Sequence, residues 1–200
     1  MDREAKKKFD NILAASLKNN LKYGEKLTDT YFISLVMKGN ESIIAGIPSL
    51  GRIGKPDFIT LVQGAMRAYE REFKELDIHL VEEVLDLVAY IERVLSKPGG
   101  CLLLAGRSGI GRKAATQLVS QLLNMEFFTP NINRDYGLKE FKRDLKFVLQ
   151  KAGIEAQKTC LFIEDHQLVQ NSFLEYLNSL ISAGEVPGLY TPEELEPLLA

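Results

Sequence analysis

The sequence predicts an α/β fold, in which an incomplete parallel sheet occupies the C-terminal half and a mainly helical segment precedes it. From residue 101 onward, short apolar runs typical of strands alternate with longer stretches of helical periodicity. This alternation is the pattern of a parallel sheet with helical crossovers. About three strands can be identified, which is few for a complete doubly wound sheet. The chain therefore contains part of a sheet, and a glycine-rich turn follows its first strand.

Three helices are predicted before the sheet, at about 4–21, 57–76 and 80–96. The first carries apolar residues at helical spacing, namely Phe9, Ile12, Leu13, Leu17 and Leu21. Pro56 and Asp57 suit the first turn of the second helix. The apolar positions of the third are wider than one stripe, which predicts a largely buried helix. Residues 22–56 are punctuated by Gly and Pro and are interpreted as an irregular connector.

The sheet is predicted from three apolar runs, at residues 101–105, 125–129 and 159–163. We expect the first and third to be buried strands, because strands covered on both faces are continuously apolar. Helices are predicted after each strand, two of them at about 138–151 and 171–183. A last short helix is predicted to begin at Thr191 and Pro192, where Thr191 and Glu194 fit the N-cap and N3 positions.

Composition and charge set limits on partners and compartment. The chain has 200 residues, is 46% apolar, and carries 25 basic and 27 acidic side chains, a formal charge of −2. This balance gives no general argument for binding nucleic acid or an anionic membrane. No apolar run reaches the roughly 18–20 residues of a membrane span, and the first residues do not resemble a signal peptide. We therefore expect a cytoplasmic protein, with neither nucleic acid nor membrane as its partner.

The turn after the first predicted strand has the glycine spacing of a phosphate-binding P-loop. Gly106 and Gly111 fit the pattern G-x-x-x-x-G-K-[ST], but Arg112 stands where Lys is expected and Lys113 where Ser or Thr holds Mg²⁺. An ammonium has no lone pair to ligate a metal. The candidate phosphate-binding residues are Gly106, Arg107, Ser108, Gly109, Ile110, Gly111, Arg112 and Lys113. The alternative is a glycine-rich strand–helix turn that binds nothing.

Two carboxylates, Glu164 and Asp165, follow the third predicted strand. P-loop ATPases place an Asp at this point to hold the Mg²⁺ shell, and a following Glu commonly activates water. Here the order is Glu then Asp, so each carboxylate differs by one methylene from the expected reach. We interpret the pair as an altered catalytic centre. The alternative is an acidic strand end that faces solvent.

These residues lie within a longer resemblance to dynein heavy chains. The segments LDIHLVEEVLDLVAYIERVLSKPGGCLLLAGRSGIGRK, NRDYGLKEFKRDLKFVLQKAG and FIEDHQLVQNSFLEYLNSLISAGEVPGLYTPEEL resemble the fourth AAA+ module of that family. The GRSGIGRK loop, the Glu-Asp order and the AGIEAQ stretch are most similar to the heavy chains that drive retrograde intraflagellar transport. The resemblance is strong from about Asp77 to Leu199.

The resemblance implies the domain organisation. Residues 1–21 correspond to the end of the preceding module's helical lid, 22–76 to a connector, and 77–200 to the N-terminal part of a truncated AAA+ large domain with a three-layer parallel sheet core. Later strands, sensor residues and the module's own lid are expected to be absent from this chain, which is then a fragment of a motor or a truncated gene model.

The resemblance also implies function. Gly106, Gly109, Gly111, Arg112 and Lys113 correspond to the Walker A loop, Glu164 and Asp165 to the Walker B pair, and Leu80 and Val81 to the stretch near the adenine. It implies a module of a microtubule motor that binds ATP or ADP, with weak or no hydrolysis and no metal ligand assigned, because both Mg²⁺ positions are altered.

Its expected partners are neighbouring AAA+ modules and, only through the full motor, intermediate and light chains and microtubules, in the cytoplasm and cilium. Two alternatives stay open. One is a nucleotide-free structural module of the motor ring, and the other is a stand-alone P-loop ATPase.

Overall fold

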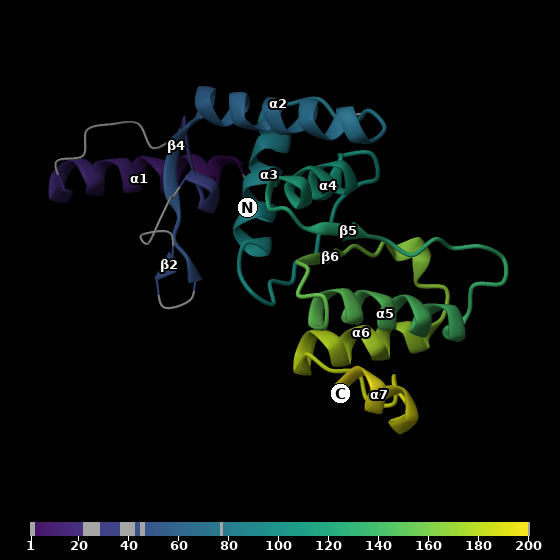
Figure 1. The fold of residues 1–200 in the computed structure, drawn as a ribbon. Coiled ribbons are helices and arrows are strands. Elements are labelled where there is room, and N and C mark those ends of the chain that lie inside the picture. The colour runs from purple at the N-terminus through teal and green to yellow at the C-terminus, as the bar shows by residue number, and fades with distance from the viewer. Residues whose placement is uncertain (1–2, 22–28, 37–42, 45–46, 77, 200) are drawn as a thin grey trace. The chain divides into compact units, whose positions relative to one another are not determined.

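The computed structural model describes residues 3–21, 29–36, 43–44, 47–76 and 78–199 (Figure 1). The chain divides into two compact units, Met1–Gln63 and Gly64–Ala200, which are considered separately. In the described residues, no helix is both long and apolar enough to cross a membrane.

The first unit combines helices with short antiparallel strands. Its elements are α1 (Arg3–Leu21), β1 (Thr30–Ile33), η2 (Ser34–Val36), β2 (Ile43–Ile44), β3 (Ile47–Pro48), β4 (Gly51–Gly54) and the start of α2 (Lys55–Glu72). β1 pairs with β4, and β2 pairs with β3. The prediction of helix α1 is confirmed, while Phe9, Ile12 and Leu13 on it are exposed.

The prediction that residues 22–56 are irregular is wrong for their described part, which contains the paired strands β1 to β4. Tyr31 pairs with Ile53 across the β1–β4 ladder, and its ring lies 4.5 Å from that of Phe58 between centroids. Ile33, at the end of β1, is completely buried. These strands could not be predicted from local composition. Their pairing joins residues about twenty positions apart, and it depends on packing rather than on the local sequence.

The second unit contains the end of α2 and the elements of the predicted sheet region. These are α3 (Glu82–Leu95), α4 (Arg112–Leu122), β5 (Glu126–Phe128), α5 (Leu138–Gly153), β6 (Thr159–Leu161), η4 (Asp165–Gln167), α6 (Asn171–Ala183) and α7 (Pro192–Leu199). β5 and β6 are parallel, with Phe127 opposite Cys160. α4 packs on β5, and α5 packs on β6 and α6. Figure 1 shows the strand pair between α4 and α5.

Part of the core lies between α5 and α6. The rings of Phe141 and Phe173 stack with centroids 4.2 Å apart, and both residues are buried. Leu189 joins the same cluster. α7 begins as predicted, because Thr191 N–H donates to the Glu194 carboxylate and Glu194 N–H donates to the Thr191 hydroxyl. The stacked aromatic rings and the capped start of α7 therefore stabilise the helices that follow β6 in the chain.

The buried strand predicted at residues 101–105 is wrong. These residues have no strand conformation, and Leu103 is 92% exposed. A parallel strand is stabilised by neighbouring strands and by helices on both faces. Among the described residues, the parallel sheet consists of β5 and β6, and residues 101–105 pair with neither strand. Cys101 is accordingly exposed, whereas Cys160 in β6 is buried, and burial raises the pKa of its thiol.

Candidate functional site

The glycine loop lies between residue 105 and α4 and adopts a conformation that needs glycine. Gly109 and Gly111 have φ of +85° and +78°, in the left-handed region. Residues 106–110 are exposed, and Gly111 precedes the first residue of α4. The N-terminus of α4 carries unpaired backbone N–H groups and the positive end of the helix dipole. The loop therefore has the backbone geometry and exposure that an anion site requires.

A buried residue that was not predicted from the sequence, Ile78, supports this loop. A Cβ added to Gly111 would lie 3.2 Å from Ile78 Cδ1, and Ile78 is buried. The residues predicted to lie near the adenine, Leu80 and Val81, follow Ile78 by two and three positions in the chain. Leu80 is half-buried and Val81, which precedes α3, is 51% exposed. Ile78 lies among other apolar residues, Leu76, Leu80 and Val81, but the sequence did not show which of them packs under the loop.

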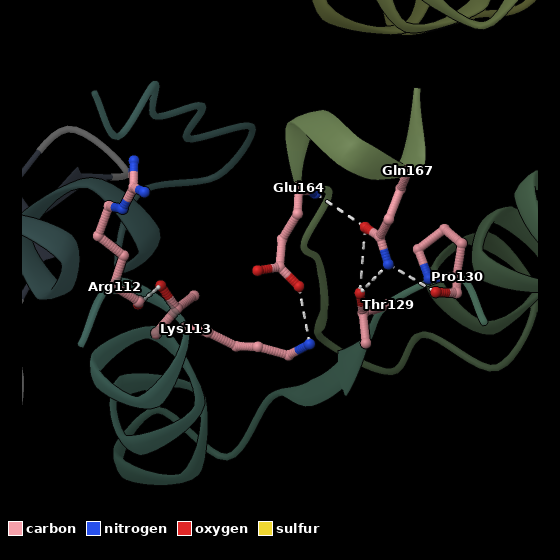
Figure 2. A network of polar contacts seen from close by, with 7 residues as sticks. Arg112, Lys113, Thr129, Pro130, Glu164 and Gln167 are labelled. Carbon is pink, nitrogen blue, oxygen red and sulfur yellow. Dashed lines mark hydrogen bonds and ion pairs between the residues drawn. The ribbon is translucent and has the colours of Figure 1, made fainter. Parts of the chain in front are cut away.

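The two adjacent basic residues of the loop extend in different directions. Arg112 donates from Nη1 to the Leu104 carbonyl oxygen at 2.8 Å. Lys113 extends toward the other half of the site, where its Nζ lies 2.8 Å from Glu164 Oε2 (Figure 2). Thr116, one turn along α4, is buried and donates to the Arg112 carbonyl. Lys113, and not Arg112, is therefore the basic group that pairs with Glu164.

The structure separates the two predicted carboxylates. Glu164 precedes η4 and is half-buried, whereas Asp165 begins η4 and is exposed. In the described residues, the Asp165 carboxylate forms no hydrogen bond or ion pair, while Glu164 pairs with Lys113. The fold thus brings together Lys113 and Glu164, which are 51 positions apart in the chain. Asp165 does not take part in this contact.

Gln167 anchors the acidic end of the site and was not predicted. This residue is 5% exposed. Its Oε1 accepts the Glu164 backbone N–H at 2.8 Å, and its Nε2 donates to the Pro130 carbonyl at 2.6 Å and to Thr129 Oγ1 at 3.1 Å (Figure 2). The chain after β6 is therefore tied to the chain after β5. The spacing of Gln167 three residues after Glu164 is a capping pattern that could have identified it.

The donor set of this site does not fit Mg²⁺. P-loop proteins hold that ion with the Ser or Thr hydroxyl of the loop and the Asp after the strand. Position 113 is a lysine, which offers no oxygen, and its ammonium is bonded to the carboxylate at position 164. Mg²⁺ requires oxygen ligands at about 2.0–2.1 Å in octahedral geometry. The side chains at the two positions that hold Mg²⁺ in P-loop proteins, Lys113 and Glu164, are instead bonded to each other.

Comparison with known proteins shows which family the sequence resembles. Residues 76–200 match the family described as P-loop containing dynein motor region D4. The chain is 47% identical over 98% of its length to "Cytoplasmic dynein 2 heavy chain 1" of Tripneustes gratilla, and 48% identical over 88% of its length to the protein of that name in Homo sapiens. The Chlamydomonas reinhardtii protein of the same name is 45% identical over 96% of the chain. The chain spans 4–5% of the length of these relatives.

Proposed function

Because this chain belongs to the family of the P-loop containing dynein motor region D4, we propose that it forms a nucleotide-binding AAA+ module of a dynein heavy chain with weak or no hydrolysis. Its identity to proteins named cytoplasmic dynein 2 heavy chain 1 supports a place in that class of motor. The resemblance of the loop and the Glu-Asp pair extends this to microtubule-based, minus-end-directed retrograde intraflagellar transport, in the cytoplasm and cilium.

One observation carries the nucleotide proposal. Two left-handed glycines, Gly109 and Gly111, form an exposed loop at the N-terminus of α4. Backbone N–H groups in this arrangement bind phosphate, and the conformation is costly for any residue with a side chain. ADP or ATP is the ligand that such a loop takes in the P-loop families. Leu80 and Val81 follow shortly after Ile78, which packs beneath Gly111, and are proposed to approach the adenine.

The altered acidic pair supports weak or absent hydrolysis. Asp165, at the position expected to activate water, is shorter than Glu by one methylene and is exposed. Glu164 is bonded to Lys113 instead of being available to a metal shell. Small errors in the position of a catalytic group cost large factors in rate. The stand-alone P-loop ATPase is therefore disfavoured.

The domain organisation belongs to the same proposal. We assign 1–21 to the end of a preceding lid, 22–76 to a connector and 77–200 to the N-terminal part of an AAA+ large domain, whose three-layer sheet would include β5 and β6. Neighbouring modules of the same heavy chain are the proposed direct partners. Intermediate chains, light chains and microtubules are partners only through the full motor.

A second candidate is a nucleotide-free structural module of the ring. The observation that favours it is that the two basic residues at the start of α4, Arg112 and Lys113, have partners of their own. Arg112 donates to the Leu104 carbonyl and Lys113 pairs with Glu164, so both cationic groups already have partners within the chain. The exposed left-handed loop favours the nucleotide-binding module over this alternative.

Nucleotide titration of the 200-residue chain tests the proposal. We expect saturable binding of fluorescent ADP and no phosphate release from ATP above the buffer rate. Gly109→Ala should weaken binding, because its φ of +85° is strained for alanine. Gly153→Ala, at the end of α5 with open space around it, is the matched control and should bind as the wild type does.

Two results would contradict the proposal. Absence of binding would support the structural alternative. Phosphate release that is abolished by Asp165→Asn or Glu164→Gln would instead show a working ATPase.

A further inference from the structure

The feature that carries a further inference is the ion pair between Lys113 and Glu164. These residues stand at the two positions that hold Mg²⁺ in P-loop proteins, the loop hydroxyl and the carboxylate after the strand. Their side chains instead meet each other at 2.8 Å, from Nζ to Oε2. Figure 2 shows the lysine extending from α4 to the carboxylate. A monovalent cation that belongs to the chain thus lies beside the carboxylate that would hold the metal.

We propose that the Lys113 ammonium takes the place of the divalent cation, so that this site binds a nucleoside di- or triphosphate without Mg²⁺. The inference rests on the proposed function, because it names the form of the nucleotide that the same loop accepts. An ammonium has three N–H donors. Glu164 takes one of them, and the Lys113 side chain is 42% exposed, so further donors are accessible to phosphate oxygens.

The same pair opposes a bound metal ion. Lys113 contributes no oxygen, and its positive charge next to Glu164 repels a dication at short range. Binding Mg²⁺ at Glu164 would require breaking the ion pair, with only one protein carboxylate recovered as a ligand. Both residues therefore oppose Mg²⁺ binding, since position 113 no longer supplies a ligand and the carboxylate of Glu164 is already bonded to Lys113.

The position of the carboxylate is held independently of any ligand. The Glu164 backbone N–H donates to Gln167, and Gln167 donates to the Pro130 carbonyl after β5. Gln167 is buried, so these bonds are shielded from water. Glu164 is thereby presented to Lys113 before nucleotide arrives, which reduces the ordering that binding would otherwise require.

Calorimetric titration of the 200-residue chain with unlabelled ADP, in MgCl₂ and separately in EDTA, tests the inference. We expect the two Kd values to agree within about twofold, because a site with no metal has no coupling to it. The double variant Lys113→Thr/Glu164→Asp restores the hydroxyl and the shorter carboxylate. Its ADP binding should be at least about tenfold tighter in MgCl₂ than in EDTA.

A matched control and an independent readout complete the experiment. Lys158→Thr removes the same charge from an exposed position before β6 and should leave both Kd values unchanged. Mn²⁺ in the presence of ADP, followed by electron paramagnetic resonance, should show no protein-dependent loss of the free-ion signal with the wild type and a loss with the double variant.

The outcomes separate the inference from the proposed function. Wild-type binding that weakens about tenfold or more in EDTA would overturn the inference and leave nucleotide binding standing. Wild-type binding in neither condition would overturn both. Lys113→Thr binding as tightly as the wild type in EDTA would also overturn the inference, since the ammonium would then contribute nothing.

Discussion

The two halves of the candidate site are built in different ways. On the phosphate-loop side, residues 106–110 are exposed and depend on glycine conformations, with Ile78 packed beneath Gly111. On the acidic side, Gln167 is buried and forms hydrogen bonds to chain segments after both strands of the parallel pair. The half-exposed ion pair of Lys113 and Glu164 joins the two sides.

The difference shows where the stability of the site resides. Removing a buried side chain that bonds backbone groups is costly, because those groups are then left with no hydrogen-bond partner from the protein or from water. An exposed loop is limited by backbone conformation, and a half-exposed ion pair is weakened by solvent. The acidic end should therefore tolerate substitution least, the loop should come next, and the ion pair should contribute least to folding.

The largest expected effect is at the acidic end. Gln167→Ala should lower the free energy of unfolding by about 2–4 kcal/mol, because the Pro130 carbonyl and the Glu164 N–H lose their partner at a buried position. Urea unfolding followed by circular dichroism measures it. Gln157→Ala, an exposed glutamine before β6, is the control and should change stability by less than about 0.5 kcal/mol. Equal effects of the two substitutions would remove the distinction between the halves.

The next effect is in the loop. Gly111→Ala should destabilise by about 1–2 kcal/mol from its left-handed φ, with an additional cost from the Ile78 contact at 3.2 Å. Gly109→Ala has a similar φ but nothing within 4 Å of the added Cβ, so it isolates the conformational part. The same unfolding experiment compares them. If Gly109→Ala were the more damaging, the support from Ile78 would not matter.

The smallest effect is in the ion pair. A double-mutant cycle with Lys113→Met and Glu164→Gln should give a coupling free energy of about 0.2–1 kcal/mol, because both side chains are partly exposed, at 42% and 30%. The coupling should fall as salt is raised. A coupling above about 2 kcal/mol would make the pair a structural element comparable with Gln167.

Several features were predictable because they depend on short stretches of sequence. The helix Asn171–Ala183 was predicted at its observed bounds, since its apolar periodicity is ended by Gly184, which has φ of +73°. The capping pair of Thr191 and Glu194 was predicted from their spacing. The positive φ at Gly109 and Gly111 is consistent with the glycine pattern. Each of these features needs only neighbours within about one helical turn.

Other features required residues far apart in the chain. An apolar run at 101–105 is typical of a buried strand, but a strand also needs neighbours, and Leu103 is 92% exposed. The β1–β4 pair was not predicted, because neither strand has a clear strand pattern in its own sequence. The two strands are stabilised by pairing with each other. Gln167 gave only a local capping signal, and its bonds to Thr129 and Pro130 come from the adjacency of β5 and β6.

The sequence by itself determined the kinds of group available at the site: a glycine loop, two adjacent basic residues and two adjacent carboxylates. Only the tertiary structure decided how they combine. Arg112 is bonded to the Leu104 carbonyl, while Lys113 reaches Glu164 across 51 positions of the chain. The physical reason is that adjacent residues at the start of a helix point about 100° apart around its axis, so only one of two neighbouring side chains can face a given partner.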